Sequence, residues 1–298
     1  MCVQQMVPNI FQRQPLTCYY ALAFAISWGA VFLLIGPNGF PASPESADSY
    51  LPFVVVATLL GPSVAGIVTT FIVQGRSGLQ CLWSKLFKWR IWYGFIPLFI
   101  PVTIGSILAI LSMVVSPEWY TPAIFRADEK LLGGNKIGFV TIGLCYGVAA
   151  GIFEEIGWSG FAVQELMRRG SDSFSAGISV GLIWGIWHFF VAFWGSGGPN
   201  GKFSTDLFVP WVPWNLLVLP AFRVIMVHIF DQTGSILLMA AIHGSLTASL
   251  PLILMPSVTG IPLASFYTLL AFAFAVIYKV FVVRLIRGLK EDKRAKVT

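Results

Sequence analysis

The sequence predicts an all-α, polytopic membrane protein of about eight transmembrane helices, and its composition and apolar patterning support this. Of the 298 residues, 56% are hydrophobic and only 11% are charged, whereas soluble domains carry roughly a quarter charged residues. The mean hydropathy is +0.79, and the apolar residues gather in runs of about 20, the length of a membrane-spanning helix. A soluble fold could not cover such a surface with polar groups, so we expect a single membrane domain over 1–298.

The first half of the chain predicts three spans and one interfacial helix. The first span covers roughly 17–36. Because Arg13 precedes it, this segment resembles a signal peptide. However, the segment is long enough to cross the membrane and no A-x-A-like cleavage site follows it, so we expect a retained helix. The second span covers roughly 51–73 and the third roughly 93–115. Between them, basic residues interleave with Leu and Trp over 76–90, which predicts an amphipathic helix at the membrane interface.

The second half predicts five further spans and a charged tail over 287–298. Glycine, proline and asparagine separate several of these runs. The spans cover roughly 137–166, 174–194, 209–230, 235–256 and 262–286. The region of about 137–256 contains the motifs that carry chemistry.

The distribution of basic residues predicts the orientation of the chain. With eight spans, the clusters at Arg13, 76–90, Arg168-Arg169 and 284–296 all fall on one side. Cytoplasmic loops carry the excess of Lys and Arg, so both termini are predicted to be cytoplasmic. The net charge of +6 is explained by these loops, and no long basic arm is present to bind nucleic acid. The four cysteines have no metal-type or disulfide-type spacing.

A few ionisable residues lie inside the predicted spans, where each costs several kcal/mol and is therefore a functional candidate. Glu154, His188 and His243 are each 12 to 16 positions from a charge at the same membrane surface. At 1.5 Å per residue they share a depth of roughly 18–25 Å. The remaining members are Glu155, Arg223 and His228, of which His228 lies near the interface and is interpreted as structural.

Small residues and i,i+4 pairs accompany these candidates. Gly147 and Gly151 precede Glu154 on nearly the same helix face, and glycines at 177, 181 and 185 form a second stripe. Such stripes allow helices to approach closely. The i,i+4 spacing also places Trp184 beside His188, and Thr247 beside His243.

The residue types indicate hydrolytic chemistry and leave the question of a metal open. A carboxylate in a low dielectric can act as general base toward water. Imidazoles can stabilise an oxyanion or bind a metal, so Glu154, His188 and His243 would also suit a catalytic zinc. The helical H-E-x-x-H motif of conventional zinc proteases is absent.

The stretch Phe153–Phe161 (FEEIGWSGF), the spaced pair Trp184-x-x-x-His188 and then His243 resemble the three motifs of the CAAX prenyl endopeptidase family, also called the CPBP (CAAX protease and bacteriocin-processing) family. The resemblance covers about 100 residues and implies an eight-helix membrane fold. It also implies that Glu154 activates water, that His188 works with it, and that His243 helps to hold the oxyanion. Glu155 and Thr247 would complete the catalytic group, with Trp184 and Trp158 lining the substrate site. The implied substrate is a peptide or a prenylated protein, and the family has been discussed both as metalloproteases and as glutamate proteases.

Two departures from the family pattern keep other functions open. The first motif is Glu-Glu-x-x-x-Arg, but Ser159 stands at its last position, so Glu155 needs another cation, for which Arg223 is one candidate. The third motif usually ends in Asn, where this chain has Thr247. A non-catalytic protein that binds a peptide or lipid, or confers bacteriocin immunity, is therefore the main alternative. A proton-coupled transporter is a third, although the sequence contains no inverted repeat.

Overall fold

The computed structural model describes residues 10–37, 39–89, 91–126, 134–282 and 284. Its described residues fold into helices, and the only β-type pairing among them is an isolated bridge between Gly197 and Phe203. The prediction of an all-α membrane fold is confirmed. The predicted charged tail over 287–298 lies outside the described residues.

Seven helical segments of the described chain are long and apolar enough to cross a membrane. Several are composite, because π-helical turns (η) join shorter α-helices into one segment. The segments are α2 (Pro15–Ile35), α3 (Pro44–Leu86), α4 (Ile96–Val114), α7–η3–α8 (Lys136–Gly157, Trp158–Val163, Gln164–Arg168), α9 (Ser173–Trp194), α10–α11–η4–α12 (Thr205–Phe208, Trp211–Pro213, Trp214–Val218, Leu219–Thr233) and α14–η6 (Gly260–Ile277, Tyr278–Val282). Short α-helices also form at α1 (Ile10–Arg13), α5 (Pro117–Tyr120) and α6 (Ala123–Arg126), and a 3-10 turn forms at η1 (Ile91–Tyr93).

The predicted seventh span is shorter than expected. It forms α13 (Ile236–Ala248) and a π-helical continuation η5 (Ser249–Ile253). The side chain of Ser235 caps its start by accepting a hydrogen bond from the Leu238 amide at 3.0 Å. The α-helical pattern ends just before Pro251, which lacks the amide that would continue it. Most residues of α13 are buried, so this helix packs inside the bundle with little contact with lipid.

The predicted amphipathic helix follows the second span without a loop. Within α3, Gly75 has φ 66° and ψ −157°, a non-helical conformation that breaks the helix into two parts. Only glycine adopts this region readily, because a β-carbon would clash with the backbone. After the break, Leu82 and Leu86 are buried and Trp83 is half exposed, as expected for a helix with one apolar face against the protein.

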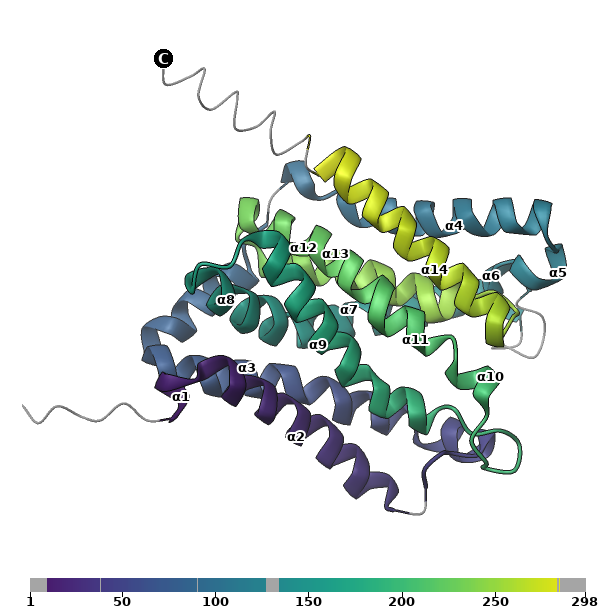
Figure 1. Cartoon of the computed structure of the whole chain (residues 1–298), viewed down its shortest axis with the longest axis horizontal. Helices are drawn as coiled ribbons and strands as arrows, with labels where there is room; N and C mark the ends of the chain where they lie inside the picture. Colours follow the sequence, from purple (N-terminus) through teal and green to yellow (C-terminus); the bar gives the residue numbers. More distant parts are fainter. Residues whose placement is uncertain (1–9, 38, 90, 127–133, 283, 285–298) are drawn as a thin grey trace, which may run out of the picture.

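The outer surface of the bundle is apolar. Large hydrophobic side chains that would destabilise a protein in water are widely exposed, which fits a lipid environment. Leu33 and Met113 are each 85% exposed and Ile137 is 82% exposed. Figure 1 shows that α1 and the C-terminal end of α14 lie at the same end of the bundle, whereas α5 and α10 lie at the other.

Candidate active site

Close packing of α7 on α13 brings the two acidic residues to the third histidine. A β-carbon on Gly147 would overlap the carbonyl oxygen of Gly244, and one on Gly151 would overlap that of Ala240. The absence of side chains at these two positions therefore allows contact between the helix backbones. Glu154 and Glu155 lie on the next turn of α7, and His243 on the facing turn of α13. The glycine stripe predicted on this span is confirmed as a packing face.

A second glycine stripe packs α9 against α12 and η4. A β-carbon on Gly177 would lie 2.7 Å from the Val224 Cα, and one on Gly181 would lie 3.1 Å from the Arg223 Cβ. This approach places Arg223, from a distant part of the sequence, next to the α9 face that carries Trp184. The side chain of Arg223 is completely buried.

Glu154 is held by two tryptophans. Its Oε2 accepts hydrogen bonds from the indole Nε1 of Trp184 at 2.7 Å and from that of Trp158 at 3.2 Å. The other oxygen, Oε1, lies 3.9 Å from His243 Nε2, which is too long for a hydrogen bond. Glu154 is 4% exposed. One carboxylate oxygen is therefore fixed, while the other points toward an imidazole without bonding it.

Glu155 is surrounded by donors. Arg223 Nη1 donates to both of its oxygens, at 2.8 and 2.7 Å, and His243 Nδ1 lies 2.8 Å from Oε1. The Ser159 hydroxyl donates to Oε2. Arg223, proposed from the sequence as one candidate cation for Glu155, is confirmed as its partner. Burying a charge is tolerated when it is paired and hydrogen-bonded, as it is here.

The hydrogen bonds of the two clustered histidines define their proton positions. His243 Nδ1 faces a carboxylate and His188 Nδ1 lies 2.9 Å from the Trp184 carbonyl oxygen. Neither acceptor has a proton to give, so both Nδ1 atoms carry hydrogen. In the neutral form, each ring therefore presents the lone pair of Nε2. His188 is only partly buried, unlike His243.

Trp184 connects the whole cluster. Its ring centroid lies 5.5 Å from that of His188 and 4.8 Å from that of His243, and the Arg223 guanidinium carbon lies 4.2 Å above it. From the sequence, Trp184 was predicted to lie beside His188 only. Its bond to Glu154 and its contact with Arg223 could not be predicted, because they depend on how α9 packs against α7 and α12. Trp158 and Trp184 are almost completely buried, and their role as substrate-lining residues stays a prediction.

Two residues named from the sequence stand apart from this cluster. Thr247 is half buried one turn after His243, and within the described chain no hydrogen bond joins it to the acidic or histidine side chains. His228 bonds the Val224 carbonyl at 3.0 Å and the Tyr278 hydroxyl at 3.1 Å. Its interpretation as a structural histidine agrees with these contacts.

The arrangement of possible ligands bears on the zinc alternative. Within the described ranges, no group of three His, Cys, Asp or Glu side chains is arranged to hold a metal ion. Glu154, His188 and His243 therefore do not form a metal-binding set in this conformation.

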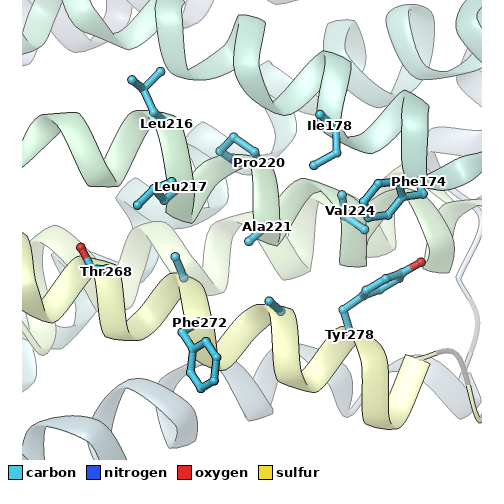
Figure 2. Close-up of a pocket in the computed structure, with 12 residues that line it drawn as sticks. Phe174, Ile178, Leu216, Leu217, Pro220, Ala221, Val224, Thr268, Phe272 and Tyr278 are labelled. Atoms are coloured by element: carbon cyan, nitrogen blue, oxygen red, sulfur yellow. The ribbon is translucent and has the colours of Figure 1, made fainter.

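An apolar groove of ≈ 420 Å³ lies on another side of α12, between α9, η4 and α14 (Figure 2). Its lining is almost entirely aliphatic and aromatic, and it contains none of the acidic or histidine residues of the cluster. The labelled residues include Phe174, Ile178, Leu216, Phe272 and Tyr278. The groove therefore supplies no reacting group.

Comparison with known proteins agrees with the geometry. Residues 136–249 match the family model described as type II CAAX prenyl endopeptidase Rce1-like. The matched region begins with α7 and ends just after α13, so it contains Glu154, His188 and His243. The match supports assignment of this region to the CAAX protease family. No curated protein matched the chain.

This family match and the seven long apolar helices among the described residues support an integral membrane protein. The chain departs from the family's first motif at Ser159, yet Glu155 is paired with a cation from another helix. The negative charge of Glu155 is therefore balanced by Arg223, although the motif arginine is missing from the sequence.

Proposed function

We propose that the chain is an intramembrane endopeptidase in which Glu154 activates a water molecule. The observation that carries this proposal is the opposition of Glu154 Oε1 and His243 Nε2 across 3.9 Å inside the bundle. That separation excludes a direct hydrogen bond but suits an oxygen atom that bonds both groups.

The contacts of Glu154 suit a general base. The two indole donors hold Oε2, so the carboxylate is oriented and Oε1 is directed at the reacting water. Glu154 takes a proton from this water, whose oxygen attacks the carbonyl carbon of the scissile peptide bond. The same proton then passes to the departing amine as the C–N bond breaks, leaving a new carboxylate and a new amine.

The histidines would support the developing charge. Once the water oxygen has bonded the carbonyl carbon, neutral His243 Nε2 takes the second proton of the water, and the imidazolium formed in this way donates a hydrogen bond to the oxyanion. Glu155 stabilises the cationic form, because its carboxylate bonds Nδ1 at 2.8 Å. His188 is partly exposed and is proposed to work with Glu154 at the entrance for the substrate, while Thr247 has a secondary role.

We propose that the substrate is a lipidated or hydrophobic peptide cut near its C-terminus. The site lies within apolar helices, so a substrate must bring its scissile bond into the membrane. Both termini of the chain are proposed to be cytoplasmic, because the basic clusters fall on that side.

The alternative is a peptide- or lipid-binding protein that keeps the scaffold without catalysis. The observation that favours it is Ser159 at the position of the motif arginine. The ion pair between Glu155 and Arg223 weakens this reading, because the carboxylate is not left uncompensated.

The test is cleavage of fluorogenic peptides, prenylated and unprenylated, by the detergent-purified protein beside the Glu154→Gln variant. The variant keeps the size and the hydrogen-bonding shape of the side chain but removes the base. We expect the wild type to cleave and the variant to lose at least about a thousandfold in kcat, with the folded fraction unchanged.

A second arm adds a chelator, to which we expect cleavage to be insensitive. Full activity of Glu154→Gln would refute the proposed base, and loss of activity on chelation that returns with zinc would replace it with a metal mechanism. Binding of the peptides without cleavage would favour the non-catalytic alternative.

A further inference from the structure

Position 159 faces Glu155 but carries no charge. Ser159 lies one turn after Glu155, at the border of α7 and η3, and its hydroxyl donates to Glu155 Oε2. A longer side chain at this position would start from the same Cβ and point at the same carboxylate. The family's motif has an arginine at this position. Ser159 points toward Glu155 as that arginine would, but it carries no positive charge.

The cation comes from a different helix. Arg223 lies 68 positions after Glu155 in the sequence, on α12, and its Nη1 donates to both oxygens of Glu155. Both side chains are completely buried. The structure describes no other Lys or Arg in an ion pair with Glu155.

The contacts of Arg223 show that it serves as the partner of Glu155. Its guanidinium stacks on the ring of Trp184 at 4.2 Å, and its Nε and Nη2 have no hydrogen-bond partner among the described residues. An arginine that merely ties helices together would be expected to use these donors on backbone carbonyls. Here all of its hydrogen bonding goes to Glu155.

We propose that Arg223 replaces the motif arginine in space and acts as the positioning residue for the Glu155–His243 pair. Through Glu155 it holds His243 Nδ1, and therefore directs His243 Nε2 toward Glu154. Without Arg223, two adjacent carboxylates would be buried with no cation between them, and Glu155 would no longer hold His243 in place. The catalytic consequence rests on the proposed peptidase function, whereas the geometric consequence does not.

The decisive experiment moves the arginine back to the motif position. The exchange variant Ser159→Arg/Arg223→Ser keeps the composition, volume and net charge of the chain, and returns the cation to one helical turn from Glu155. We compare it with Arg223→Ser alone and with the conservative Arg223→Lys. Thermal unfolding in detergent reports whether each variant is folded.

The first readout is kinetic. We expect Arg223→Ser to lower kcat by about a hundredfold while KM changes by less than about threefold, because a misplaced His243 affects the transition state more than binding. The exchange variant should recover to within about tenfold of the wild type. Arg223→Lys should lie between them, since an ammonium keeps the positive charge but not the planar stacking of the guanidinium on Trp184.

The second readout does not require activity. The chain has three histidines, so ¹⁵N-histidine labelling gives three imidazole spin systems that His→Gln variants assign. In Arg223→Ser, the signals of His243 should shift while those of His228, bonded to Tyr278, stay in place. In the exchange variant, the signals of His243 should return.

The outcomes separate the two proposals. A folded Arg223→Ser protein with unchanged His243 signals would overturn the positioning role, whatever its activity. If Arg223→Ser does not fold, a folded exchange variant with restored His243 signals supports the proposal, and an unfolded one overturns it. If the wild type cleaves no peptide, the peptidase proposal fails while the His243 signals still decide the role of Arg223.

Discussion

Glu154 and Glu155 are neighbours in sequence but have different environments. Glu154 accepts two neutral indole N–H bonds and keeps one oxygen directed at His243. Glu155 is paired with Arg223, His243 and Ser159. A carboxylate with an uncommitted oxygen suits a base, and a carboxylate saturated with donors suits a support. These contacts favour Glu154 as the proposed base and Glu155 as the residue that supports His243.

At the residue scale, the Trp184 indole N–H can be tested alone. Trp184→Phe keeps a ring beside Arg223 but removes the 2.7 Å bond to Glu154. A hydrogen bond to a charged group contributes about 1.5–3 kcal/mol, so we expect a loss of about 10- to 150-fold in kcat/KM.

The matched control is Trp194→Phe, on the same helix. Trp194 is also buried, but its indole nitrogen has no partner in the described chain, so activity should be retained. Equal losses in the two variants would show that general packing, and not the bond to Glu154, is responsible. The measurement is steady-state cleavage of the fluorogenic peptide.

At the element scale, glycines determine which helix faces meet. Gly151 on α7 approaches Ala240 on α13, and Gly181 on α9 approaches Arg223 on α12. In a bilayer the helices gain little from leaving lipid, so such close van der Waals contact contributes strongly to their association. The two interfaces together assemble residues from α7, α9, α12 and α13 into one cluster.

We expect Gly151→Ala to separate α7 from α13. Its β-carbon would overlap the Ala240 carbonyl, which is backbone and cannot rotate away. Overpacking of this kind costs about 1–3 kcal/mol, so the thermal unfolding temperature in detergent should fall and peptide cleavage should decrease with it. Gly105→Ala on α4 is the control, because a β-carbon there meets nothing within 4 Å. An unchanged unfolding temperature in Gly151→Ala would contradict the close packing.

At the scale of the whole molecule, the bundle has two distinct ends. The start of α1 and the end of α14 share one end, and α5 and α10 lie at the other (Figure 1). The basic pair Arg168-Arg169, at the turn between α8 and α9, would place its end in the cytoplasm by the positive-inside rule.

Cysteine labelling can test this orientation. In a background with the four native cysteines replaced, Ser171→Cys and Asn200→Cys place single thiols before and after α9 (Ser173–Trp194). We expect an impermeant maleimide to label position 200 in intact cells and position 171 only in inverted vesicles. Labelling of both from the same side would refute the predicted crossing.

The amino-acid sequence by itself determined the membrane class and the approximate spans, and it predicted a common depth for the candidate site residues. These follow from local properties: runs of apolar residues, basic loops and the fixed rise of a helix. The sequence also indicated the glycine faces and the acidic and histidine residues, because an ionisable group in a span is rare enough to be noticed alone. It overestimated the seventh span, since apolar residues continue past the end of α13 at Ala248.

Only the tertiary structure decided which side chains bond one another. The two tryptophan bonds to Glu154 and the arginine paired with Glu155 join helices that are far apart in the chain. Helical periodicity gives the direction of a side chain on its own helix but not the rotation of the neighbouring helix. That rotation is set by close packing at glycines, where a difference of one methyl group changes the fit. The partner of Glu155 could therefore be suggested from the sequence but was identified only in the folded bundle.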